Sequence, residues 1–126
     1  MTEEFLLIEN LLYKIYQQKI TDYLTDLECK EYFGSNFKIN QLNIKYRKAK
    51  ITPKKTGHFV TLWRRNEDKI TEPFTVNDVF DFYIIATKEN NNFGFFLFPK
   101  EILSEKNILS NDIKEGKRGF RVYSDW

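Results

Sequence analysis

The chain has 126 residues, of which 41% are hydrophobic and 17% aromatic. This length and composition predict one domain, residues 1–126, with a packed core. The sequence has one cysteine, one histidine, no apolar run long enough for a membrane span, and an acidic N-terminus where a secretory signal would be basic. We therefore expect a cytoplasmic protein that has no internal disulfide, no zinc site and no membrane partner.

Charge is distributed unevenly along the chain. The formal net charge is +2, yet residues 38–66 hold nine basic residues and no acidic one. Residues 1–37 hold three lysines against seven acidic residues, and residues 67–126 hold eight basic against eleven acidic residues. Because a local field attracts polyanions even when the net charge is small, this block predicts a basic binding surface.

The first predicted element is a long N-terminal helix that begins near Thr2. Thr2 is expected to cap it, with Glu3 and Glu4 at the positive end of the helix dipole. A bend is expected around Thr21 and Asp22. Apolar residues recur at steps of three to five, which indicates one buried stripe: Phe5, Ile8, Leu12, Ile15, Tyr16, Ile20, Tyr23 and Leu27.

From Tyr32 onward the periodicity is that of strands. Turn residues separate six β-rich runs: YFGSNFKIN, LNIKYRKAKI, HFVTLWRR, DFYIIATK, NFGFFLF and GFRVY. Asn40 and Gln41 predict a tight hairpin between the first two runs, and Pro99 opens a short helix. The predicted fold class is α+β with a three-layer α/β/α tendency, in which a mixed sheet of five or six strands accompanies the two helices.

The basic block lies on a pair of strands and on the loop ITPKKTG between them. Charges on the first strand point to both of its faces, and both faces cannot be core. We therefore expect this strand to leave the body of the domain toward an exposed loop tip with Lys54 and Lys55. The next strand returns to Trp63, Arg64 and Arg65, which predicts a basic rim around an aromatic ring.

Cations and flat rings on one surface are typical of nucleic-acid binding. Lysine and arginine neutralise phosphates, rings stack on bases, and Gly116 and Gly119 would allow a close approach to the backbone. Tyr46 is a second stacking candidate, or else a core residue. The alternative is that the lysines only keep an exposed hairpin soluble. The predicted nucleic-acid-binding residues are Arg47, Lys50, Lys54, Lys55, Trp63, Arg64, Arg65, Lys100, Lys117, Arg118 and Arg121.

Five segments together resemble the MepB-like family of small bacterial proteins. They are EYFG (31–34), YRKAKITPKKTGHFVTLWRR (46–65), PFTVNDVFDFYIIA (73–86), GFFLFPKEIL (94–103) and GKRGFRVY (116–123). The resemblance implies a fold similar to that of restriction-endonuclease-like nucleases, and a role in binding nucleic acid, with DNA as the expected partner. It implies no settled activity. Family members continue past the last strand into another helical stretch, whereas this sequence ends at Trp126.

Nucleases of that fold hold Mg²⁺ with two or three carboxylates beside a lysine. Here Asp81 opens a strand and Lys100 follows the next strand, but Phe98 stands where the second acid is expected. We therefore predict a degenerate active site with no catalytic residue, no metal and no cofactor. The alternative is a Mg²⁺-dependent nuclease that uses Glu31, Asp81 and Lys100, with Asp78 as a further carboxylate. Two hypotheses from different functional classes are a module that binds a small anionic ligand and a module that binds an acidic protein.

Overall fold

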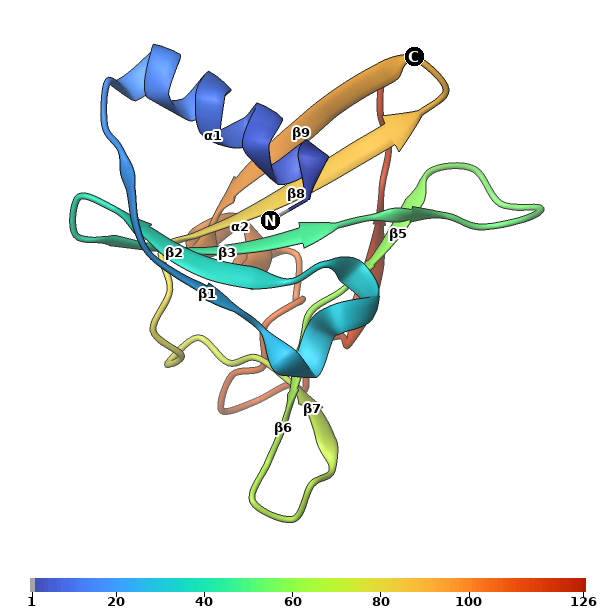
Figure 1. The fold of residues 1–126 in the computed structure, drawn as a ribbon. Helices are drawn as coiled ribbons and strands as arrows, with labels where there is room; N and C mark the ends of the chain where they lie inside the picture. Colours follow the sequence, from blue (N-terminus) through green and yellow to red (C-terminus); the bar gives the residue numbers. More distant parts are fainter. Residues whose placement is uncertain (1) are drawn as a thin grey trace.

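The computed structural model describes residues 2–126 and is built around one five-stranded sheet (Figure 1). Its neighbouring strands are antiparallel except for β3 and β8, which are parallel. The predicted α+β class and mixed sheet are thus confirmed. In sheet order the strands are β1 (Ile20–Thr25), β2 (Ser35–Ile39), β3 (Leu42–Lys48), β8 (Phe82–Glu89) and β9 (Asn92–Pro99).

Helix α1 (Glu3–Tyr16) covers one face of this sheet and is shorter than predicted (Figure 1). Thr2 caps it as expected, because its hydroxyl accepts a hydrogen bond from the Phe5 amide at 3.1 Å. The helix ends where Gln17 adopts a left-handed conformation with φ of 55°. The predicted helical stripe beyond that point is wrong, because Ile20–Thr25, which is rich in β-formers, becomes β1.

The other face of the sheet carries a second layer that is mainly β-structure rather than the predicted helical layer. A three-stranded sheet in the order β10-β5-β4 packs there together with α2 (Lys100–Glu105). Val60 and Leu62 share one core with Tyr83 and Ile85 of β8 and with Leu103 of α2. The small sheet consists of β4 (Lys50–Ile51), β5 (His58–Thr61) and β10 (Gly119–Val122).

Three shorter features complete the structure. The 3₁₀ helix η1 (Leu27–Tyr32) joins β1 to β2, and a separate hairpin pairs β6 (Trp63–Arg65) with β7 (Thr71–Pro73). The predicted turn at Asn40 is confirmed, since Asn40 has a φ of 55° between β2 and β3. Within residues 2–126, the helices are too short or too polar to span a membrane.

The layering gives the molecule two cores, one on each face of the main sheet. Phe5, Ile8 and Leu12 of α1 fill the first, and the small sheet and α2 close the second. Strand β8 contributes to both and is buried on both faces, as its continuous apolar run predicts. The outer face of the small sheet is therefore left toward solvent.

Candidate functional site

The outer face of the small sheet combines cations with aromatic rings. Lys50 and Arg121 both pair with Phe59, on the two sides of β5. Directly paired residues project from the same face of a sheet, so these three side chains share a surface. Val60, one position further along β5, is fully buried in the core. Because successive side chains of β5 point to opposite faces, one face of the small sheet is the candidate binding surface and the other belongs to the core.

This surface continues past β5 onto β6. Thr61, Trp63 and Arg65 alternate with the buried Leu62 and line a depression of about 340 Å³ together with Tyr32 of η1. Glu28 and Glu31 of η1 also line this depression. The Tyr32 and Phe59 rings lie 6.5 Å apart between centroids, which joins the two parts. We call this surface the aromatic-basic face and define it as Tyr32, Lys50, Phe59, Trp63, Arg65 and Arg121.

Each ring of the aromatic-basic face has a cation above it. The Lys50 ammonium lies 4.6 Å from the Tyr32 centroid, and the guanidinium groups of Arg65 and Arg121 lie 5.3 and 5.7 Å from Trp63 and Phe59. At exposed sites, each cation–π contact of this kind stabilises the arrangement of its two side chains by about 0.5–1 kcal/mol. No ion pair to Lys50 or Arg65 occurs within residues 2–126. Both side chains are exposed, and the Arg65 guanidinium donates to the Lys69 carbonyl at 3.2 Å.

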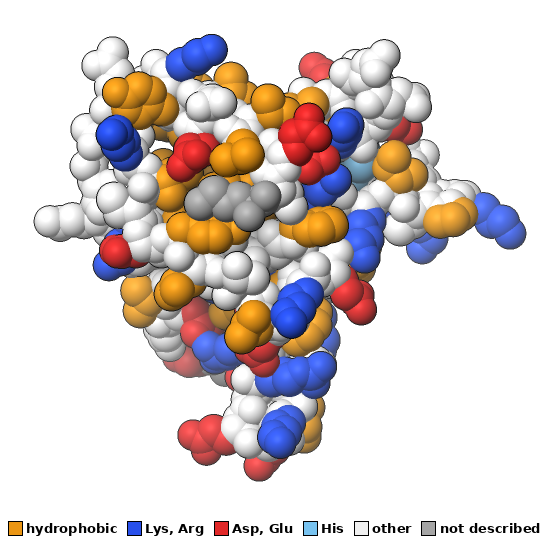
Figure 2. All heavy atoms as spheres, in the orientation of Figure 1, with side chains coloured by type: hydrophobic (Ala, Val, Ile, Leu, Met, Phe, Trp, Pro, Cys, Tyr) orange, Lys and Arg blue, Asp and Glu red, His pale blue; other side chains and the backbone are white. Residues whose placement is uncertain are grey.

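The loop of residues 52–57 projects from one end of this face (Figure 1). Arg121 fastens its base by donating to the Thr52 hydroxyl and, at 3.2 Å, to the Thr56 carbonyl. Lys54 and Lys55 are exposed on the loop, in agreement with the predicted loop tip, and Figure 2 shows basic side chains at its outer end.

Arg47 is not part of the surface, and its prediction as a phosphate contact is wrong. Its side chain is fully buried and its Nη2 atom donates to the Asp26 carboxylate at 2.8 Å. The Arg47 Nη1 atom donates to the Tyr46 carbonyl at 3.0 Å. Tyr46 is also buried, in the core beside Phe5, so it cannot stack on a base. Both residues serve the fold, because an arginine buried this deeply needs its carboxylate partner.

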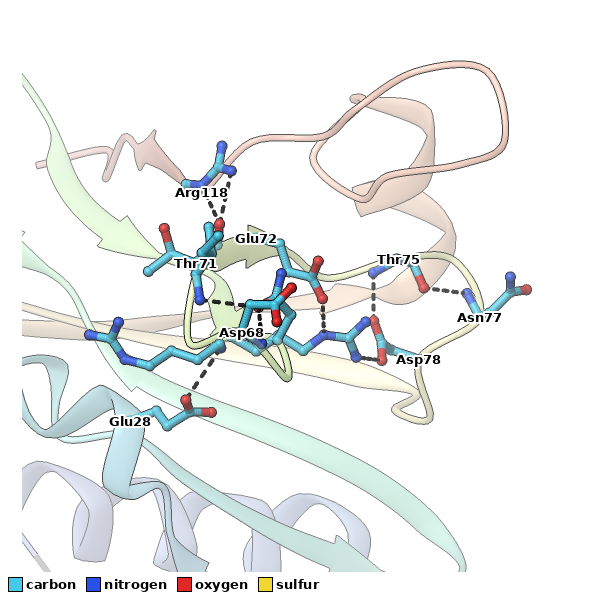
Figure 3. A network of polar contacts seen from close by, with 12 residues as sticks. Glu28, Asp68, Thr71, Glu72, Thr75, Asn77, Asp78 and Arg118 are labelled. Atoms are coloured by element: carbon cyan, nitrogen blue, oxygen red, sulfur yellow. Dashed lines mark hydrogen bonds and ion pairs between the residues drawn. The ribbon is translucent and has the colours of Figure 1, made fainter.

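Arg64 is engaged by two carboxylates and is not available as the sequence predicts. It donates to Glu72 at 3.1 Å and also to Asp78, which in turn accepts from the Thr75 amide (Figure 3). Arg118 lies at the edge of this network and donates to the Thr71 carbonyl at 3.0 Å (Figure 3). These contacts fix the β6–β7 hairpin against the loop that leads to β8.

The glycines near β10 make room for the protein itself rather than for a ligand. A Cβ atom on Gly119 would lie 2.5 Å from the Phe59 ring, and one on Gly116 would lie 2.2 Å from the Ile108 carbonyl oxygen. The predicted close approach of a ligand to these glycines is thus wrong. Lys117, between them, is exposed.

The candidate nuclease residues do not form a metal site. The Asp81 carboxylate accepts a hydrogen bond from the Asn43 backbone N–H at 2.7 Å, and the Lys100 ammonium donates a hydrogen bond to the Asp78 carbonyl. Glu31 lies on η1, next to the end of β2 that pairs with Tyr46, and is therefore at the far end of β3 from Asn43. In the part of the chain that the structure describes, no three His, Cys, Asp or Glu side chains lie close enough to hold an ion.

Two comparisons with known proteins place this chain in a family. The family model for MepB-like proteins matches residues 26–126. The chain belongs to the MepB-like family. It also superimposes on the crystal structure of MepB with a TM-score of 0.84 and 31% sequence identity, over 100% of this chain and 83% of MepB. A search of curated proteins found no match.

Sequence reasoning missed the most perturbed lysine of this MepB-like chain. Lys45 of β3 borders a cleft of about 540 Å³ that is lined by β1, β2, β3 and the loop before β8. Its ammonium lies 4.3 Å from the Phe74 centroid and donates to Asn36 at 3.3 Å. Burial, with a smaller contribution from the charge of Arg47, lowers the pKa of Lys45 to about 8. The only signal in the sequence is its place in the acid-free block.

Replacing Lys45 by methionine is expected to stabilise the protein near pH 7 by about 1–3 kcal/mol, because burying the charged form is costly. Between pH 8 and the ordinary pKa near 10.5, the unfolded chain binds more protons at this position than the folded protein does. The advantage of the variant should therefore shrink as the pH rises through this window. Urea unfolding of both proteins at several pH values measures the difference.

The exposed Lys19 provides the matched control, since Lys19→Met should leave the unfolding free energy within about 0.5 kcal/mol. Burial also raises the pKa of Tyr46 and of Tyr83. The wild type and Lys45→Met consequently both lose stability above about pH 10, so only the difference between their unfolding free energies reports on Lys45. If the gain in unfolding free energy of Lys45→Met stays constant from pH 7 to 10, the charge of Lys45 does not destabilise the folded protein.

Proposed function

We propose that this MepB-like protein binds nucleic acid through the aromatic-basic face, with DNA as the expected partner. The observation that carries the proposal is that three half-buried rings each carry a cation on one surface. Lys50 and Arg65 are exposed there, and Arg121 is bonded to the neighbouring loop. Cations attract the phosphate backbone and release its counterions, and rings stack on bases of any sequence. Lys54 and Lys55 extend the positive charge along the neighbouring loop.

A single strand suits this surface better than a duplex. Tyr32, Phe59 and Trp63 are each partly exposed and lie at the end of η1 and on two strands rather than on a protruding helix. Bases of a duplex are stacked on one another, so rings of this kind reach them only in unpaired segments. Stacking combined with phosphate contacts gives binding that depends strongly on salt and weakly on sequence.

The scaffold itself is proposed to be restriction-endonuclease-like with a degenerate active centre, so that binding remains without cleavage. In support, Asp81 directly precedes β8 and Lys100 directly follows β9, which are two of the positions that the pattern requires. Their side chains, however, are engaged by the backbone of the protein itself. The proposed site of action is the cytoplasm, where bacterial nucleic acid is found.

An acidic protein partner is less well supported. Such an interface would have an exposed apolar patch beside the basic charge. The larger group of exposed apolar side chains lies on α1, across the main sheet from the small sheet, so it does not border the aromatic-basic face. These side chains are Leu6, Leu7, Leu11, Tyr13 and Ile15. Next to the face, Leu27 in the depression and Ile51 of β4 are exposed.

A second candidate function is the binding of a small anion in the cleft beside Lys45. The observation that favours it is that Lys45 has no carboxylate within ion-pair distance among residues 2–126. Titration with phosphate should then raise the thermal midpoint of the wild type but not that of Lys45→Met. Equal midpoints with and without phosphate would remove this candidate.

The experiment that tests nucleic-acid binding is fluorescence anisotropy with labelled single-stranded and duplex oligonucleotides at about 50 and 200 mM salt. We expect the single strand to bind more tightly and its affinity to fall steeply between the two salt concentrations. Each mixture is then run on a denaturing gel with Mg²⁺ or EDTA. Fragments that appear only with Mg²⁺ would restore the nuclease alternative, and a lack of binding at low salt would reject the proposal.

A further inference from the structure

A cavity of about 320 Å³ lies between the loop of residues 52–57 and the last residues of the described chain. His58 lines it, and the loop contributes Lys55. Glu89, Ser124 and Trp126 line the remainder together with Tyr123. The volume is at the lower end of the range of about 300–1,000 Å³ that is usual for small-ligand pockets, so one ring system fits it.

His58 is the unexplained group of this cavity. Only 3% of the residue is exposed, and neither ring nitrogen has a hydrogen-bond partner among residues 2–126. A neutral imidazole offers one N–H donor and one nitrogen acceptor. Buried groups of this kind are paired in nearly all proteins, because an unpaired one costs stability. An unpaired histidine at a cavity wall favours a ligand with hydrogen-bonding groups. Because both ring nitrogens are closed to solvent, such a ligand pairs with one of them only when the side chains that cover the ring move.

The other lining residues restrict what that ligand is. The Trp126 indole is held at the wall because its Nε1 atom donates to the Glu89 carboxylate at 3.2 Å. Its ring centroid lies 6.4 Å from that of His58 at an interplanar angle of 81°. The charges of Glu89 and Lys55 offset one another, so the cavity favours a neutral ligand over an anion. Aromatic walls favour a flat ring.

We propose that this cavity binds one unstacked nucleobase, with the Trp126 and Tyr123 rings against its faces and His58 hydrogen-bonded to its edge. The nucleobase comes from a bound strand or from a free nucleotide, and the chemistry of recognition is the same. Its origin in a strand rests on the proposed function, because the loop of residues 52–57 borders both the cavity and the aromatic-basic face. A base that enters the cavity is read at its hydrogen-bonding edge, whereas stacking on the open face is not selective.

The test compares three homopolymers of about 12 nucleotides, built from dT, dA or dC, by anisotropy. The wild type should prefer one homopolymer by about 3- to 10-fold, the range that one hydrogen bond supports. His58→Phe keeps an aromatic ring and should abolish that preference without lowering the thermal midpoint, because it removes two unpaired polar atoms. Trp126→Ala should weaken all three homopolymers alike, and Tyr13→Ala on α1 is the matched aromatic control without effect.

A second measurement needs no variant at His58. Free nucleoside monophosphates are added to the wild type while the indole N–H signals of Trp63 and Trp126 are followed by NMR. A shift of the Trp126 signal supports the pocket. If oligonucleotides bind but the preference survives in His58→Phe and the Trp126 signal does not move, the pocket is overturned and the proposed function stands. If free nucleotides move the Trp126 signal while no oligonucleotide binds, the pocket stands and the proposed function fails.

Discussion

Replacing Asp26 by asparagine is expected to lower the free energy of unfolding by about 3–5 kcal/mol, because it leaves the Arg47 charge buried without a counterion. Arg47 is fully buried and the Asp26 side chain is 16% exposed, so little water reaches the pair. Asparagine can still accept from the Glu28 amide, as Asp26 does at 3.1 Å, so the cap of η1 is retained. Urea unfolding monitored by circular dichroism measures the loss.

The matched control is Asp22→Asn, which removes an exposed carboxylate that lies 4.0 Å from the Lys38 ammonium. Pairs of that kind contribute about 0–1 kcal/mol, so this variant should unfold almost like the wild type. Adding Arg47→Met to Asp26→Asn removes the unpaired charge and should recover part of the loss. If Asp26→Asn costs less than about 1 kcal/mol, Arg47 is solvated, and its exclusion from the binding surface is wrong.

The double variant Lys50→Glu with Arg65→Glu is expected to weaken single-stranded DNA binding by about 10- to 100-fold near 100 mM salt, because each cation contributes about 1 kcal/mol or more through phosphate contacts. The slope of log affinity against log salt should fall by about 1.4, since each phosphate contact on a single strand contributes about 0.7. The loss should be similar for every sequence. Anisotropy at several salt concentrations provides both numbers.

Both side chains are suited to this test because they stabilise little else. Lys50 is exposed over Tyr32, and the Arg65 guanidinium makes one bond to the Lys69 carbonyl at 3.2 Å. Arg64 is unsuitable, because its removal would leave Asp78 without its partner. The control Lys14→Glu with Lys106→Glu changes the net charge equally at exposed positions on α1 and after α2. An equal loss in the control would mean that net charge, and not the aromatic-basic face, governs binding.

Local signals predicted much of the fold. The Thr2 cap, the Asn40 turn and the apolar run of β8 each depend on neighbouring residues, and the structure has all three. The extent of α1 could not be predicted in the same way. Gln17 ends the helix without the glycine that usually marks such an end, and the apolar spacing beyond it fits a helix as well as β1.

For the candidate site, the sequence predicted several of the residues that take part but not which of the cations are free to bind. Trp63, Arg65, Lys50 and Arg121 were expected on a binding surface, and the register of β4, β5 and β10 places Lys50 and Arg121 beside Phe59. The burial of Arg47 depends on Asp26, 21 positions earlier, which no local pattern reveals. The same holds for Arg64, whose two carboxylate partners belong to β7 and to the following loop. Which cations are free is set by tertiary contacts.

The measurement that tests the central claim most directly is an NMR titration of the ¹⁵N-labelled protein with a short single-stranded DNA, because it locates the bound strand residue by residue. We expect the largest amide and side-chain shifts at Lys50, Phe59, Trp63 and Arg121, with smaller shifts along the loop of residues 52–57. Residues of α1 should not move, since α1 lies on the other face of the main sheet. Shifts confined to α1 or to the cleft beside Lys45, or no shifts at saturating DNA, would contradict the account.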